Sequence, residues 1–204
     1  MSVKLFGVRI HIGVFAAAAI ACLINYGQPT VYGIGFASVV LHEATHLLLM
    51  RVFGCSRPSV EILPGGVKIR DGDFVRLGYF PTAVCLLGAP VVNLLAAGVF
   101  FLCGQTMETG DWFRQAAAVN LALGAVNLLP LSILDGGSAL DNLLRGLGRE
   151  RIALRASRLC DVLCLSAIAG LNLWTVLRRH PSAPLIVFFL YCLAAVAAGH
   201  KNKG

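Results

Sequence analysis

Apolar stretches about as long as a bilayer is thick recur along this chain of 204 residues. A helix needs roughly 20 consecutive apolar residues to cross the hydrocarbon core of a membrane. Only 13% of the residues are charged, whereas a typical soluble domain has about 25%. Because lipid leaves backbone polar groups unsatisfied outside helices and closed barrels, this pattern predicts an all-α polytopic membrane protein.

We predict about six transmembrane helices within a single integral-membrane domain covering residues 1–204. The spans are expected at approximately 10–26, 30–52, 81–103, 111–128, 159–177 and 184–198. Between the second and third spans, Gly-Gly and Asp-Gly pairs separate short alternating runs, which predicts a small membrane-associated β-hairpin within 59–77. Residues 138–158 have the pattern of a basic amphipathic helix on the membrane surface.

The basic residues predict the orientation of these spans. A cytoplasmic N-terminus places 14 of the 17 Lys and Arg residues on the cytoplasmic side, with Arg178 and Arg179 as a discordant pair. We therefore expect a multi-pass protein of the cell membrane with both termini in the cytoplasm. The net charge of +7 is concentrated in short connecting segments, which is typical of contacts with lipid headgroups. We expect no nucleic-acid binding, because the aromatic-basic interleaving of a nucleic-acid groove is missing.

The five residues from His42 to His46 form an HExxH motif inside the second predicted span. His42 and His46 share a helix face and can bind one metal ion, and Glu43 beside them can take a proton from an attacking water. A helix that buries these groups without function is the alternative, but three ionisable residues in a span are costly. With about 1.5 Å of rise per residue, His46 and His42 lie roughly 8 Å and 14 Å from Arg51. The motif therefore predicts an intramembrane zinc hydrolase whose site lies nearer the cytoplasmic face.

A catalytic zinc ion usually has three protein ligands, so HExxH needs one more. Asp135 follows an apolar run, after a helix break at Pro130 and before Gly136-Gly137, which would let the backbone turn tightly. We therefore predict one Zn²⁺ per chain, with Asp135 as the third ligand. The remaining candidates are expected at the surface: His11, Asp141, His180 and His200.

Asn93 and Asn127 are amides at membrane depth. Each is a candidate for binding the substrate backbone or stabilising the oxyanion, and hydrogen bonding between helices is an equally open alternative. We favour Asn127, because it is nearer to Asp135 in sequence.

Four motifs, in this order, resemble those of the site-2 protease family of intramembrane metalloproteases, most closely the stage IV sporulation protease branch. They are the HExxH at His42–His46, a Pro-x-Gly-Gly-like turn at Leu63–Gly66, a Gly-Pro-x-x-Asn-like segment at Gly88–Asn93, and an Asn-x-x-Pro…Leu-Asp-Gly pattern at Asn127–Gly137. The resemblance covers roughly residues 5–158, and residues 159–198 are then additional spans. Ala44-Thr45, Ile133 and Ser138 depart from the family's common residues, but none of them removes a ligand or Glu43.

The resemblance implies regulated intramembrane proteolysis of a membrane-associated or membrane-tethered regulatory protein, such as a pro-sigma factor or an anti-sigma factor. It also implies membrane inhibitory partners. An extended substrate could pair with the predicted hairpin as an added strand. Because the sequence ends near the sixth predicted span, we expect no nucleotide-sensing CBS domain.

Two other functions are alternatives to this one. The first is a non-proteolytic metal-binding or transport protein, although the internal repeats of transporters are missing. The second is another membrane zinc hydrolase, such as a prenyl-protein protease, which fits the surroundings of Asp135 less well.

Overall fold

The computed structural model describes residues 2–5, 8–12, 29–55, 59–63, 66–70, 77–106, 110–180 and 182–201. Within them the helices are α2 (Pro29–Val52), α3 (Tyr79–Thr106), α4 (Gly110–Asn127), α5 (Asp135–Gly146), α6 (Glu150–Leu177) and α7 (Ala183–Lys201). The strands are β1 (Ser2–Leu5), β2 (Val8–Ile12), β3 (Ser59–Leu63) and β4 (Gly66–Arg70).

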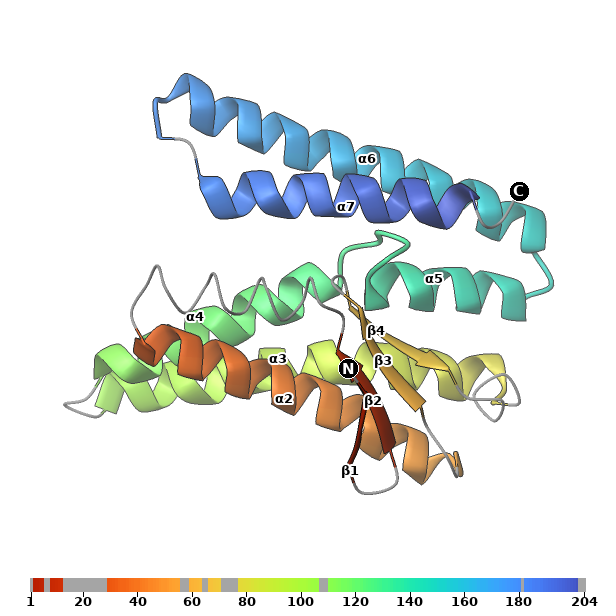
Figure 1. Ribbon diagram of the computed structural model, residues 1–204, viewed down its shortest axis with the longest axis horizontal. Helices are drawn as coiled ribbons and strands as arrows, with labels where there is room; N and C mark the ends of the chain where they lie inside the picture. Colours follow the sequence, from red (N-terminus) through yellow and green to blue (C-terminus); the bar gives the residue numbers. More distant parts are fainter. Residues whose placement is uncertain are drawn as a thin grey trace.

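Helix α3 is the centre of the helical framework and packs against α2, α4 and α5 (Figure 1). The close approach of α4 to α3 depends on a glycine. A Cβ atom on Gly124 of α4 would lie 2.9 Å from the carbonyl oxygen of Pro90, the proline inside α3. Glycine at this position therefore lets α4 lie directly against the proline-containing turn of α3.

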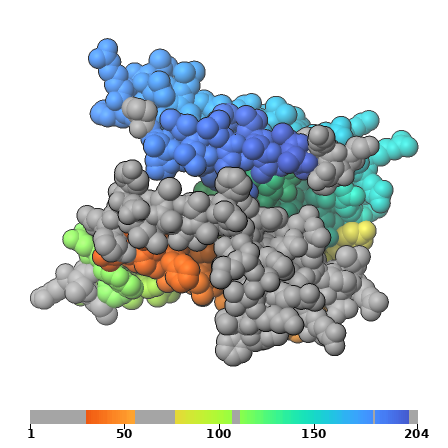
Figure 2. Space-filling view, viewed as in Figure 1, coloured from red at the N-terminus to blue at the C-terminus, as the bar shows by residue number. Residues whose placement is uncertain are grey.

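Helices α6 and α7 lie side by side as a separate layer, and α5 lies between this layer and α3 (Figure 1). In the space-filling view, the blue and cyan atoms of α6 and α7 lie together in the upper part of the molecule (Figure 2). An apolar cluster joins this layer to the chain before α5, where fully buried Leu131 packs with Cys192 and Val196 of α7. The α6–α7 layer therefore contacts the segment that leads to Asp135.

Three of the described helices are long and apolar enough to cross a membrane: α2 from Thr30, α3 and α6. Helix α7 contains a shorter apolar stretch, Ala183–Gly199. Large apolar side chains on these helices are exposed, among them Phe36, Leu95 and Leu177, as expected of surfaces that face lipid. The composition of the helices is that of a multi-pass membrane protein. The number of six spans and the cytoplasmic termini stay predictions.

The strands form one sheet in the order β1-β2-β3-β4, so the all-α prediction is incomplete. β3 and β4 pair antiparallel, within the segment for which the sequence predicts a hairpin, and β2 joins β3 in parallel. The prediction of a first helix from residue 10 is wrong for Ile10–Ile12, which belong to β2. Its apolar residues alternate with Arg9 and His11, a pattern that favours a strand. The remainder of that predicted span, 13–26, lies outside the described residues.

The prediction of one amphipathic helix over 138–158 is also wrong, because the chain changes direction between α5 and α6. Gly148 has a φ of +70°, which glycine adopts without steric cost, and its N–H donates to the Arg145 carbonyl over 2.9 Å. α5 therefore ends at Gly146, and α6 starts at Glu150. The basic residues 151–158 lie in the first turns of an apolar helix rather than on a separate surface helix.

Candidate metal centre

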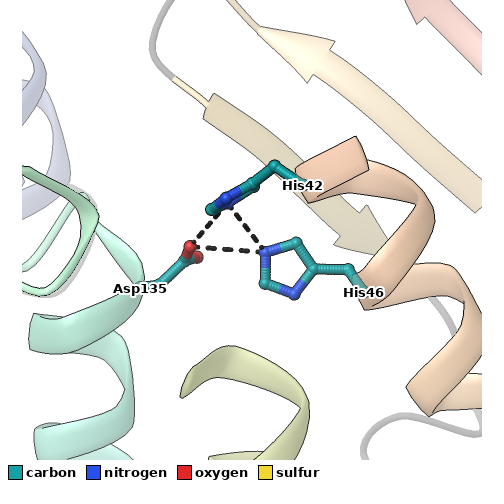
Figure 3. Close-up of side chains that lie close together, drawn as sticks. All are labelled: His42, His46 and Asp135. Atoms are coloured by element: carbon teal, nitrogen blue, oxygen red, sulfur yellow. Dashed lines mark hydrogen bonds and ion pairs between the residues drawn. The ribbon is translucent and has the colours of Figure 1, made fainter. Parts of the chain in front are cut away.

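Helix α2 supplies two imidazoles to one point inside the protein. His42 and His46 are one helical turn apart, and each is about 5% exposed or less. Their rings lie 4.9 Å apart between centroids and nearly perpendicular, with an interplanar angle of 81°. Both Nε2 atoms point towards α5 (Figure 3). The four-residue spacing of the motif therefore produces the expected shared face.

Asp135 comes from the first turn of α5, opposite the two histidines (Figure 3). The prediction that Gly136-Gly137 makes a tight turn is wrong, because both glycines lie inside that first helical turn. Instead, they let the backbone of the preceding segment lie close to the first turn of α5. A Cβ on Gly136 would lie 2.6 Å from the Leu128 carbonyl carbon, and one on Gly137 would lie 2.8 Å from the Ser132 nitrogen. The backbone before α5 thus folds directly onto the turn that carries Asp135.

Three potential donor atoms meet at this point. Asp135 Oδ2 lies 3.0 Å from His42 Nε2 and 3.3 Å from His46 Nε2, and the two nitrogens are 3.2 Å apart. Ligands held 2.0–2.1 Å from a tetrahedral zinc ion are roughly 3.3 Å from one another. Two neutral imidazoles and one carboxylate are also a donor set of catalytic zinc sites. The residues present therefore fit a zinc ion, and they form the one His/Cys/Asp/Glu cluster of this kind among the described residues.

The other ring nitrogen of each histidine has an acceptor as its partner. His46 Nδ1 is 2.8 Å from the backbone oxygen of Cys85, and His42 Nδ1 is 2.7 Å from Asn93 Oδ1. A carbonyl oxygen can only accept, so the Nδ1 atoms carry the protons and the Nε2 lone pairs face Asp135. This arrangement fixes the tautomer that a metal-binding histidine requires.

The orientation of the Asn93 amide follows from its other partners. Asn93 Nδ2 donates to the Asn120 Oδ1 over 2.9 Å and to the Ser38 carbonyl over 3.3 Å. Asn120 in turn donates to the Ser38 hydroxyl over 2.9 Å. Asn93 is completely buried and Asn120 is 2% exposed. This polar network joins α2, α3 and α4 and leaves Asn93 Oδ1 to accept from His42.

The structure thus brings together His42, His46, Asp135 and Asn93, whereas Asn127 donates to the Leu123 carbonyl of its own helix over 3.0 Å. Glu43 lies on α2 beside His42 and is partly buried. The sequence interpretation missed Asn120 altogether. Its amide in an otherwise apolar helix is the same signal that singled out Asn93 and Asn127. The roles of Asn93 and Asn127 towards a substrate stay predictions.

Comparison with known proteins gives a match to a family model, to a curated protein and to a solved structure. Residues 87–169 match peptidase family M50. The zinc metalloprotease MJ0392 of Methanocaldococcus jannaschii is 29% identical over 119 residues, which are 53% of this chain and 32% of that protein. The chain therefore spans about a third of the length of this relative.

The site-2 protease from Methanocaldococcus jannaschii has the same fold, with a TM-score of 0.68 over 97% of this chain and 94% of that chain. The two sequences are 20% identical, so this likeness bears on the fold alone. The matched segment starts after the HExxH helix and includes Asp135, and the two histidines are supplied by α2. The chain is thus similar to peptidase family M50 over residues 87–169, to a zinc metalloprotease over 53% of its length and, in fold, to a site-2 protease.

Proposed function

We propose that this protein is an intramembrane zinc metalloprotease that hydrolyses a peptide bond of a membrane-associated or membrane-tethered regulatory protein. The observation that carries the proposal is the convergence of His42, His46 and Asp135, with donor atoms 3.0–3.3 Å apart, next to Glu43. A metal-binding or transport protein needs the donors but has no use for a general base beside them. The position of Glu43 therefore favours hydrolysis.

The chain's own residues divide the work of the reaction. A zinc ion held by His42, His46 and Asp135 would polarise the scissile carbonyl and make the attacking water more acidic. Glu43 would accept the proton of that water and return it to the leaving amine. Asn93 and the Cys85 carbonyl hold the imidazoles in their binding orientation, so the histidines need little reorganisation during the reaction.

Glu43→Gln tests the mechanism. The amide keeps the size of the side chain but cannot accept the proton, so we expect proteolysis to be lost and bound zinc to stay at one per chain. Glu150→Gln is the matched control, because Glu150 is exposed at the start of α6, and it should cleave like the wild type. Full proteolysis by Glu43→Gln would disprove the role of Glu43 and favour the non-hydrolytic alternative.

For the substrate we propose a pro-sigma factor or an anti-sigma factor, in a sporulation or a related regulatory pathway with membrane inhibitory partners. The sequence motifs support this class, and the cleavage of such proteins in the membrane needs a site within a multi-pass framework. The test is co-expression of membrane-tethered candidates of both kinds with wild type or Glu43→Gln. An uncut protein that accumulates only with the variant identifies the substrate. If every such candidate stays uncut beside an enzyme that cleaves other membrane proteins, this substrate class is wrong.

The sheet offers a way to bind an extended substrate. β4 is an edge strand of the sheet that the described residues form. The register pairs Leu63 with Gly66 across a two-residue connection, and the pair next to such a connection is a hydrogen-bonded one. Because hydrogen-bonded and non-hydrogen-bonded pairs alternate along an antiparallel ladder, Val67 and Ile69 belong to the non-hydrogen-bonded pairs. The N–H groups of Val67 and Ile69 are therefore directed away from β3 and could bond to an added strand.

Proline at position 67 or 69 removes one of these N–H groups. We expect Val67→Pro and Ile69→Pro to slow cleavage without loss of zinc. Val67→Ala and Ile69→Ala keep the N–H and should cleave faster than the proline variants. Equal cleavage by proline and alanine variants would exclude strand addition at β4.

A further inference from the structure

Besides Glu43 and Asp135, a further carboxylate lies at membrane depth in the described helices and has no part in the chemistry above. Asp161 is 1% exposed and lies on α6, a helix long and apolar enough to span a membrane. Ala153 and Asp161 are the two buried residues of that helix. An ionisable side chain buried in a span is costly, and its partner usually reveals what it does.

Both carboxylate oxygens of Asp161 accept hydrogen bonds from Ser132. The Ser132 N–H donates to Oδ1 over 2.7 Å, and the Ser132 hydroxyl donates to Oδ2 over 2.8 Å. Ser132 lies in a turn closed by the bond from the Leu134 N–H to the Leu131 carbonyl, 2.8 Å long. Asp161 thus binds backbone and side chain of the same turn residue, which fixes the turn in both position and orientation.

This turn ends where the metal site begins. Leu134 is the residue before α5, and Asp135 is the first residue of that helix. The preceding Leu131 is completely buried against α7. The turn is therefore held by hydrogen bonds to Asp161 of α6 and by the packing of Leu131 against α7. The residue that directly follows the turn is Asp135, whose carboxylate faces the histidines.

We propose that Asp161 is a positioning residue for the metal centre, which acts through Ser132 to hold Asp135 in its ligand position. His42 and His46 have their own outer partners, Asn93 and the Cys85 carbonyl. Asp161 supports the third ligand, Asp135, but it acts through the Ser132 turn rather than by direct contact. The inference concerns metal binding and does not require that the protein cleave a peptide. It rests on the proposed function only in assuming that the bound zinc serves proteolysis.

The test is zinc affinity of the full-length protein in detergent, measured by competition with a chromogenic chelator. Loss of an outer partner of a ligand typically weakens metal binding about 10- to 100-fold, so Asp161→Ala should fall in that range. Asp161→Asn should bind zinc within about threefold of the wild type, because its amide can accept from the Ser132 N–H and donate to the Ser132 hydroxyl. Ser132→Ala should lie between the two, because the backbone bond stays.

Three further measurements separate positioning from general stability. Asn172→Ala is the control, because Asn172 donates to the Leu185 carbonyl at the far end of the α6–α7 pair; it should lower the unfolding temperature but leave the zinc affinity unchanged. Cobalt(II) in place of zinc should give an altered visible spectrum in Asp161→Ala and a normal one in Asp161→Asn. The unfolding temperature without metal shows whether each variant is folded. If Asp161→Ala does not fold, Ser132→Ala takes its place as the test variant.

Wild-type zinc affinity in folded Asp161→Ala, or in folded Ser132→Ala where the aspartate variant fails to fold, would overturn the proposal. Zinc binding by Asp161→Asn as weak as that of Asp161→Ala would overturn the hydrogen-bonding role and assign the effect to charge. A wild type that binds zinc but cleaves no protein would remove the proposed function and leave this inference intact.

Discussion

The two sides of the metal centre are built in different ways. His42 and His46 come from one continuous helix, and their relative position follows from the helical repeat. Asp135 stands at a helix start that depends on a turn, on two glycines and on contacts with α6 and α7. The relative backbone position of the two histidines therefore follows from local geometry, whereas the backbone position of Asp135 needs tertiary support. Both sides also have side-chain support from other helices, which the variants below remove in turn.

Removal of a ligand gives the largest expected effect and should be the same on both sides. His46→Ala and Asp135→Ala each leave two donors where a catalytic zinc site has three. We expect zinc affinity to fall by more than about 100-fold, beyond the range for an outer partner. Zinc content after dialysis against a weak chelator measures it. Stoichiometric zinc in Asp135→Ala would remove Asp135 from the ligand set.

Asn93→Ala tests the support of the histidine side. It removes the acceptor of the His42 Nδ1–H and also the donor to the Asn120 Oδ1 and to the Ser38 carbonyl. We expect zinc to bind about 10- to 100-fold more weakly. Asn127→Ala is the matched control, since the one described hydrogen bond of Asn127 is within its own helix, and zinc binding should be unchanged. Equal losses in both variants would show that Asn93 has no special role at His42.

Gly137→Ala tests the support of the aspartate side and should have a smaller effect. The added Cβ would collide with the backbone of Leu131 and Ser132. Overpacking of this kind costs about 1–3 kcal/mol, and the displaced turn should also weaken zinc binding. Gly33→Ala in α2 is the control: nothing lies within 4 Å of its added Cβ, and alanine favours a helix by up to about 1 kcal/mol over glycine.

Denaturant unfolding in detergent, with zinc affinity measured alongside, compares the two glycine variants. A Gly137→Ala protein as stable and as tight for zinc as Gly33→Ala would mean that the turn can move without cost. The difference between the two sides of the site would then disappear.

Predictions from the sequence succeed here where a continuous local pattern of apolar residues determines the secondary structure. The apolar runs anticipate α2, α3, α4 and α7 to within a few residues, because burial in lipid requires continuous helix. They fail at the N-terminus, where β2 joins β3 in parallel over more than 45 residues of chain. An apolar stretch that starts in a strand cannot be distinguished by hydropathy from the start of a span. The break at Gly148 was missed for a related reason, since one glycine in a basic segment is a weak signal.

The sequence by itself determined the chemical identity of the site: HExxH in an apolar helix, a carboxylate after a proline break, and hence three zinc donors. Those features depend on residue type and helical spacing, which are local. Only the tertiary structure decided which buried groups hold the donors. Asn93 turned out to be the partner of His42, Asn120 to orient Asn93, and Asp161 to bind the turn before Asp135. These partners come from different helices, and which of them meet depends on how the helices pack, a property that no single segment of the chain contains.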